Sequence, residues 1–216
     1  MKPVYRYDIE QRTPEWDDMR RIRFTASHAT AIKAHDTGLD TYVKEIARGY
    51  FSRDVHKEFS EDFSNKHIER GNKYEDVARS IYELETGNEV KQIGIITLGE
   101  YFACSPDGLV NEDGLIEIKC MGDKKFYEYA TSKKIDPNHY NQMQMQLFIS
   151  DRQYCHYCVF NPNFSPSLII ETIKKDANAI ENIKQGLKKG VALLQQEIKI
   201  ANEILVPIMK GEINGN

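Results

Sequence analysis

The segment CSPDGLVNEDGLIEIKC, residues 104–120, decides the fold class and most of the expected chemistry. It holds two short apolar runs separated by Asn, Asp and Gly, a pattern typical of paired β-strands joined by a turn. Side chains alternate between the two faces of a strand, so Glu117 and Lys119 share one face and the apolar residues between them share the other. We therefore predict a strand at residues 115–120 that carries a carboxylate and a lysine side by side.

A second carboxylate, Asp107, lies ten residues before Glu117, at a predicted turn. A hairpin that returns through Asp113-Gly114 can bring these two carboxylates together. Hard oxygen ligands of this kind suit Mg²⁺, with Mn²⁺ as a substitute. Lys119 would then orient or deprotonate a water, or stabilise charge on a phosphate. The alternative is that Glu117 and Lys119 are neighbours on the solvent face of an amphipathic strand.

A third carboxylate comes from a predicted helix at residues 66–86, which ends at Gly87. The apolar stripe of this helix consists of Ile68, Gly71, Tyr74, Val77, Ala78, Ile81 and Tyr82. Glu75 projects at the edge of that stripe, where an unpaired carboxylate loses hydration. Two interpretations stay open: Glu75 pairs with Arg79 one turn later, or it faces the sheet as a metal ligand.

The rest of the chain alternates helical and strand-like patterns. We predict helices at 13–20, from Thr25, and at 39–52, 123–132, 137–149 and 176–205, with further strands at 89–97, 100–105, 153–160 and 167–173. This order predicts an α/β fold with a mixed central β-sheet flanked by helices. No repeat or linker divides the chain, so we expect a single domain over residues 1–216, whose long C-terminal helix packs on its own sheet.

Composition supports a protein with one sizeable core that works in the cytoplasm. The chain has 216 residues, of which 40% are hydrophobic, and it contains neither a membrane-length apolar run nor a signal-peptide pattern. The formal net charge is −4, but residues 58–117 carry −9 between flanks of +2 and +3. An acidic middle third between basic flanks favours a metal site beside a phosphate-binding surface, although a solvated acidic helix would give the same pattern.

Five blocks of sequence, in this order, resemble the family of phage lambda exonuclease and YqaJ-type viral recombinase nucleases, a branch of the restriction-endonuclease-like fold. They are Trp16-Asp17-Asp18-Met19-Arg20 with Phe24-Thr25-Ala26-Ser27, Gly71 to Arg79, Cys104 to Leu109, Gly114 to Cys120, and Asn141-Gln142-Met143-Gln144. The resemblance covers roughly residues 13–160. Each block is short, and their common order carries the similarity.

The resemblance implies a role for particular residues. By this resemblance, the metal ligands of the protein would be Glu75, Asp107, Glu117 and the backbone carbonyl of Ile118, and Lys119 would be the catalytic lysine. Arg20 would hold a terminal 5′-phosphate, while Ser27, Ser105 and Gln142 would position phosphates or the attacking water. For Gln142, which shares a helix face with Gln146, an ordinary polar face is the competing interpretation.

The resemblance also implies a function. The expected enzyme is a Mg²⁺-dependent 5′ to 3′ exonuclease that digests one strand of linear double-stranded DNA in a bacterial host cell. It would leave 3′ single-strand overhangs for phage-type recombination, work beside a single-strand annealing protein and assemble as a homotrimer. The alternatives are a structure-specific DNA endonuclease of the same fold and a non-catalytic DNA-end-binding module.

Overall fold

The structure is a computed structural model that describes residues 1–52 and 66–209. Its helices are α1 (Pro14–Arg21), α2 (Ala29–Ala34), α3 (Thr37–Phe51), α4 (Lys66–Thr86), α5 (Asp123–Ser132), α6 (Pro137–Ser150) and α7 (Ala177–Met209), with a 3-10 turn, η1 (Ala26–His28), before α2. Its strands are β1 (Pro3–Arg6), β2 (Phe24–Thr25), β3 (Val90–Lys91), β4 (Ile95–Leu98), β5 (Phe102–Cys104), β6 (Gly108–Val110), β7 (Gly114–Cys120), β8 (Tyr154–Phe160) and β9 (Leu168–Lys174). The helices expected from the sequence are all found.

The strands form two sheets instead of the one central sheet expected. Their orders are β1-β4-β5-β2 and β3-β6-β7-β8-β9, and each contains parallel and antiparallel pairs. The expected strand at 89–97 is split because the chain bends near Gly94, where a Cβ would overlap the carbonyl of Ile9. Thus β3 joins one sheet and β4 the other. The α/β class and a mixed sheet flanked by helices are confirmed, whereas the second, four-stranded sheet was not predicted.

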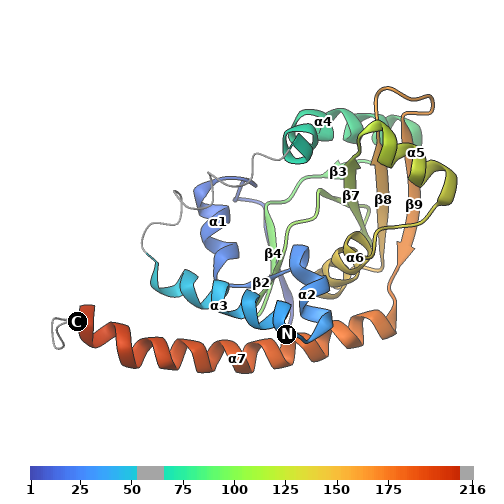
Figure 1. Cartoon of the computed structure of the whole chain (residues 1–216). Helices are drawn as coiled ribbons and strands as arrows, with labels where there is room; N and C mark the ends of the chain where they lie inside the picture. Colours follow the sequence, from blue (N-terminus) through green and yellow to red (C-terminus); the bar gives the residue numbers. More distant parts are fainter. Residues whose placement is uncertain (53–65, 210–216) are drawn as a thin grey trace.

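Helices cover both faces of the five-stranded sheet (Figure 1). On one face, Ile116 and Ile118 of β7 pack with Ala78 and Tyr82 of α4 in one buried apolar cluster. On the other face, Leu115 belongs to a larger cluster that also contains buried residues of α6. Both faces of β7 are therefore enclosed, so Glu117 does not lie on a solvent face. One member of the predicted α4 stripe, Val77, is exposed, while the burial of Ile68 and Gly71 is not among the described features.

The long helix α7 packs on other helices, and its expected packing on its own sheet was wrong. It runs along the base of the molecule beneath α2 and α3 (Figure 1). Gly186 permits this contact, because a Cβ there would clash with the carbonyl of Ile32 in α2. Beyond Leu194, which is buried, apolar side chains of α7 become exposed, among them Ile200, Ile204 and Leu205.

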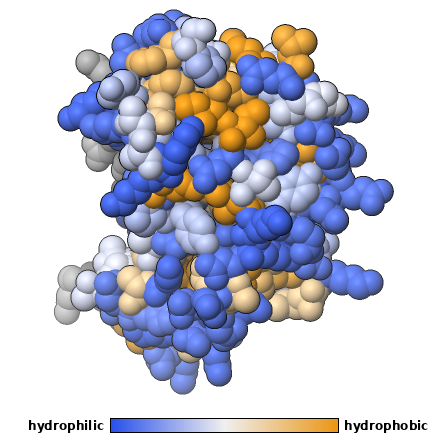
Figure 2. Space-filling model, turned by 90° about the vertical axis from the view of Figure 1, so that its right-hand side faces the viewer, coloured by the Kyte–Doolittle hydropathy of each residue, from blue (hydrophilic) through white to orange (hydrophobic). Residues whose placement is uncertain are grey.

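One face of the molecule carries apolar side chains at its surface. On the face beside β9, apolar side chains gather in the upper half, at the level of the five-stranded sheet, above a band of hydrophilic ones (Figure 2). Within the described residues, no helix is both long and apolar enough to cross a lipid bilayer.

Candidate active site

Glu117 lies at the centre of a buried polar network between β7 and α6. Only 2% of the residue is exposed. Its Oε1 accepts hydrogen bonds from Lys119 Nζ and Gln142 Nε2, both at 2.7 Å, and its Oε2 accepts one from Gln146 Nε2 at 2.7 Å. A buried carboxylate needs such partners to offset lost hydration. The exposed-strand interpretation of Glu117 and Lys119 was therefore wrong, as was the ordinary polar face for Gln142 and Gln146.

Asp107 lies beside Glu117, at the residue before β6. The antiparallel register pairs Gly108 with Ile116, and the backbone N–H of Ile118 donates to Asp107 Oδ2 at 2.6 Å. Burial, followed by the negative charges of Glu117 and Glu75, raises the pKa of Asp107 well above its ordinary value. Among the described residues, Asp107 Oδ1 has no hydrogen-bond donor. The site thus concentrates negative charge that the surrounding side chains only partly compensate.

Glu75 reaches the same region from α4, but it is held by two arginines. Its Oε1 accepts from Arg79 at 2.8 Å and its Oε2 from Arg12 at 2.5 Å. The sequence-based pairing with Arg79 is thus confirmed. The charge of Glu75 still acts on Asp107, which shows that the carboxylates share one electrostatic environment.

Lys119 completes the site as a cation. Its Nζ also donates to Gln142 Oε1 at 3.3 Å. Burial acts to lower the pKa of Lys119, but the charges of Glu117 and Asp107 outweigh it, so this pKa lies above its ordinary value. A protonated Lys119 can donate hydrogen bonds to a water or a phosphate.

The donor chemistry of this site fits a hard divalent cation, although the ligands are not gathered around one point. Among the described residues, no three His, Cys, Asp or Glu side chains lie close enough to share a metal ion. The reason is visible: Glu117 is engaged by α6 and Glu75 by two arginines. In a β-strand, the backbone N–H and C=O groups of every second residue point toward the same neighbouring strand. The Ile116 carbonyl accepts a hydrogen bond from the Asp107 N–H, so the Ile118 carbonyl points toward the same side of β7, where Asp107 precedes β6. Asp107 and this carbonyl therefore offer oxygen atoms at the place where uncompensated negative charge accumulates.

A small cavity next to the carboxylates contains the four residues expected to contact phosphate. Arg20, Ser27, Ser105 and Gln142 all line a cavity of about 180 Å³. The guanidinium of Arg20 stacks on the Trp16 ring, 4.0 Å from its centroid, and donates to Ser27 Oγ at 3.2 Å. Burial lowers the pKa of Arg20 from its ordinary value, but an arginine keeps its charge at neutral pH. A half-buried guanidinium beside hydroxyl groups suits a phosphate.

The sequence interpretation gave no role to two residues that line this cavity, Trp16 and Gln146, or to His28, which contacts the lining residue Ser27. The Trp16 indole N–H donates to Ser105 Oγ at 2.8 Å, which fixes one wall. His28 stacks on Tyr42 with ring centroids 4.0 Å apart, and burial and the nearby Arg20 lower the pKa of His28 to about 4. Gln146 is fully buried, and its Oε1 has no hydrogen-bond partner. The spacing of Gln146, one turn after Gln142, was the only sequence signal for its role.

A second, larger cavity of about 560 Å³ adjoins the first one on the α4 side. It contains Glu75 and Asp107 and extends past Tyr7 and Gln92, and both cavities include Gln11 and Arg12. Gln11 is fixed by hydrogen bonds to the carbonyls of Ile93 and Pro106 at 2.8 and 3.0 Å. The carboxylates therefore lie between two openings that meet at residues 11 and 12.

Comparisons with known proteins show which family and fold this chain resembles. Residues 15–153 match the model of the YqaJ-like viral recombinase domain. The chain is similar to the crystal structure of an alkaline exonuclease, LHK-Exo, from Laribacter hongkongensis, with 28% identity, a TM-score of 0.78, and coverage of 91% of this chain and 100% of that one. A structure of LHK-Exo in complex with dAMP matches with 27% identity, a TM-score of 0.79 and the same coverage.

A more distant match supports the fold alone. A phage-related exonuclease from Haemophilus somnus 129PT has 16% identity and a TM-score of 0.60, with coverage of 85% of this chain and 98% of that one. No curated protein sequence matches significantly.

Proposed function

The chain belongs to the family of YqaJ-like viral recombinase domains, and we propose on this basis that it is a DNA exonuclease that depends on Mg²⁺. The relative that matches over its full length is an alkaline exonuclease. We propose further that it digests one strand of linear duplex DNA from the 5′ end in the cytoplasm of a bacterial host. The 3′ overhangs that remain would serve a single-strand annealing protein.

One juxtaposition carries this proposal. The buried carboxylate Glu117, the half-buried Asp107 and the cation Lys119 lie beside a cavity whose wall holds the half-buried Arg20. Hydrolysis of a phosphodiester needs negative ligands for a divalent cation and positive groups for phosphates, in adjacent places. A module that only binds DNA ends would need the positive groups for phosphates but not the negative ligands for a cation.

The chain's own residues divide the work between binding and chemistry. Asp107, Glu117, the Ile118 carbonyl and Glu75 would hold Mg²⁺, which when bound would stabilise the charge that develops on the scissile phosphate. Arg20, with Ser27 and Ser105, would hold the terminal 5′-phosphate and so fix the scissile bond one nucleotide further along. Water forms a bond to phosphorus, the P–O3′ bond breaks, and a 5′-mononucleotide leaves. Lys119 and Gln142, which hold Glu117, would also orient the water.

An incubation with end-labelled duplex tests the function directly. Linear duplex carrying a label on either the 5′ or the 3′ end of one strand should release a labelled mononucleotide early only from the 5′ end. Chelation of divalent cations should stop the reaction, and Mn²⁺ should restore it. Early release from the 3′ end would contradict the proposed polarity, and no release at all would favour the DNA-end-binding alternative. A covalently closed circle should stay intact, whereas the endonuclease alternative predicts that it is cut.

The phosphate pocket predicts a dependence on the chemistry of the DNA end. Duplex with a 5′-phosphate should be digested about ten-fold faster than duplex with a 5′-hydroxyl, because the half-buried Arg20 forms charge-assisted hydrogen bonds only with the phosphate. Arg20→Ala should bring the two rates close together, which single-turnover rates on both substrates would measure. The control Arg48→Ala, an exposed residue of α3, should keep the difference. An unchanged ratio in Arg20→Ala would count against the pocket as a phosphate site.

The exposed end of α7 supports the proposal of a homotrimer. Ile200, Ile204 and Leu205 project from a helix whose earlier part is buried by α2 and α3, so another surface is needed to cover them. Closed cyclic symmetry would place three active sites around a channel that holds the DNA. Light scattering should give a mass near three times 25.0 kDa, and Ile204→Glu should lower that mass and shorten the processive run. A monomer at micromolar concentration in the unmodified protein would contradict the trimer.

A further inference from the structure

Arg12 is the residue whose position calls for a functional explanation. Its guanidinium donates to Glu75 Oε2, yet its own side chain is 51% exposed. Its backbone has φ 66°, a left-handed conformation that a non-glycine residue rarely adopts. The residue is thus held in an unfavourable backbone state to place a cation against one carboxylate.

The two oxygens of Glu75 have very different partners. Oε1 is held by Arg79, whose side chain is only 11% exposed and which also binds Asp76. Oε2 is held by Arg12, which reaches it from the solvent side. If Arg12 moves away, Arg79 still fixes the carboxylate and leaves Oε2 free. The structure therefore separates a permanent partner of Glu75 from a removable one.

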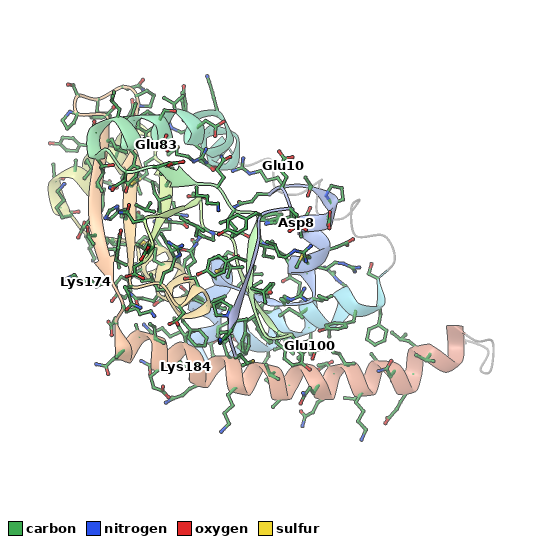
Figure 3. The ribbon with its side chains drawn as sticks, turned by 180° about the vertical axis from the view of Figure 1, so that it is seen from behind. Asp8, Glu10, Glu83, Glu100, Lys174 and Lys184 are labelled. Carbon is green, nitrogen blue, oxygen red and sulfur yellow. The ribbon has the colours of Figure 1, made fainter. Side chains whose placement is uncertain are left out.

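Arg12, the removable partner, also borders a second possible binding site. Arg12 lines the cavity that holds Glu75 and Asp107 and equally the cavity that holds Arg20, Ser27 and Ser105. The segment that carries it passes between the beginning of α4 and α1, where Asp8 and Glu10 project (Figure 3). Its neighbour Gln11 anchors the backbone by two hydrogen bonds, so a change in the Arg12 side chain need not move the chain.

We propose that Arg12 is a latch that occupies Oε2 of Glu75 in the metal-free protein and transfers to the 5′-phosphate when substrate enters. The inference rests on the proposed function for the identity of both ligands. Two events are coupled by this transfer: Glu75 becomes available to the divalent cation, and the phosphate gains a second arginine beside Arg20. Phosphate binding and metal binding would then favour each other.

The charge arrangement supports a latch over a purely structural ion pair. A half-exposed ion pair contributes little to stability, so stability alone does not explain a strained backbone at this position. Five carboxylates line the larger cavity: Asp8, Glu10, Glu75, Asp76 and Asp107. The Arg12 guanidinium lowers the mutual repulsion of these carboxylates in the metal-free protein. A bound metal ion would supply the same positive charge and so replace it.

The test measures binding without DNA cleavage. Mg²⁺ is titrated calorimetrically into the metal-free protein, with and without dAMP as a probe for the phosphate site. Because Arg12 competes for Glu75, Arg12→Ala should bind Mg²⁺ about three- to five-fold more tightly than the unmodified protein when dAMP is absent. In the unmodified protein dAMP should raise the affinity for Mg²⁺ several-fold, and in Arg12→Ala this increase should be smaller.

Two variants make the result interpretable. Arg6→Ala removes the same charge from the same segment, but its partner is Asp8, so Mg²⁺ affinity and its response to dAMP should stay unchanged. Arg12→Gly suits the left-handed backbone, and it should behave as Arg12→Ala does if the alanine variant is unstable. Equal Mg²⁺ affinity in the unmodified protein and both Arg12 variants, or an unchanged response to dAMP, would overturn the latch. Absence of any Mg²⁺ binding would instead contradict the proposed function.

Discussion

Asp107→Asn is expected to lower the rate of DNA hydrolysis on the order of 10³-fold or more, because a carboxylate at a metal site contributes several kcal/mol of transition-state stabilisation. Steady-state release of labelled mononucleotide with Mg²⁺ would measure the loss. Asp113→Asn is the matched control, since it changes an exposed aspartate on the same hairpin and should leave the rate unaltered. A rate within a few-fold of the unmodified enzyme would remove Asp107 from the metal site.

The same substitution should leave the metal-free protein at least as stable as before. The pKa of Asp107 is raised by burial and by the charges of Glu117 and Glu75, so the folded state binds a proton more tightly than the unfolded state does. Stability from this group is present at low pH and lost as pH rises through the raised pKa. The asparagine oxygen can still accept the Ile118 N–H, and it carries no charge. Tm in chelator should therefore exceed that of the unmodified protein at neutral pH, with a difference that shrinks in acid.

Local patterns predicted the helices better than the strands. Thr13 caps α1 with its side chain and Pro14 follows at the first helical position, while Gly87, at φ 71°, ends α4, as their residue types indicate. The strands β1 and β2 were not predicted. They are two to four residues long and exist because distant segments pair with them, as Pro3 does with Leu98. Alternation of side chains cannot be recognised over so few residues.

The site shows the same division between local and distant information. Glu117 and Lys119 were found from spacing within one strand, and the hairpin that brings Asp107 near is local too. The hydrogen bonds from Gln146 to Glu117 and from Arg12 to Glu75 join residues 29 and 63 positions apart. Nothing in the local pattern distinguishes a buried glutamine that binds a carboxylate from one on a polar helix face. Tertiary packing alone decides which polar residues enter the site.

The second large effect is expected at Lys119, where stability and catalysis can be separated. Lys119→Met leaves the buried Glu117 without its cation, so the free energy of unfolding should fall on the order of 3 kcal/mol, and the rate should fall on the order of 10²-fold or more. Lys119→Arg keeps the charge beside Glu117 and should recover most of the stability. It should not recover the rate, because the larger planar guanidinium cannot occupy the same position between Glu117 and Gln142.

Comparing the Tm with the single-turnover rate of each variant would separate the two roles of Lys119. Lys124→Met serves as the control, because Lys124 is a highly exposed residue of α5. Full recovery of the rate in Lys119→Arg would mean that the site needs only a positive charge at this position. Stability without activity would instead show that the ammonium group itself acts on the water or the phosphate. The buried network around Glu117 would then have two separable functions: the charge of Lys119 holds the carboxylate in place, and its geometry serves the reaction.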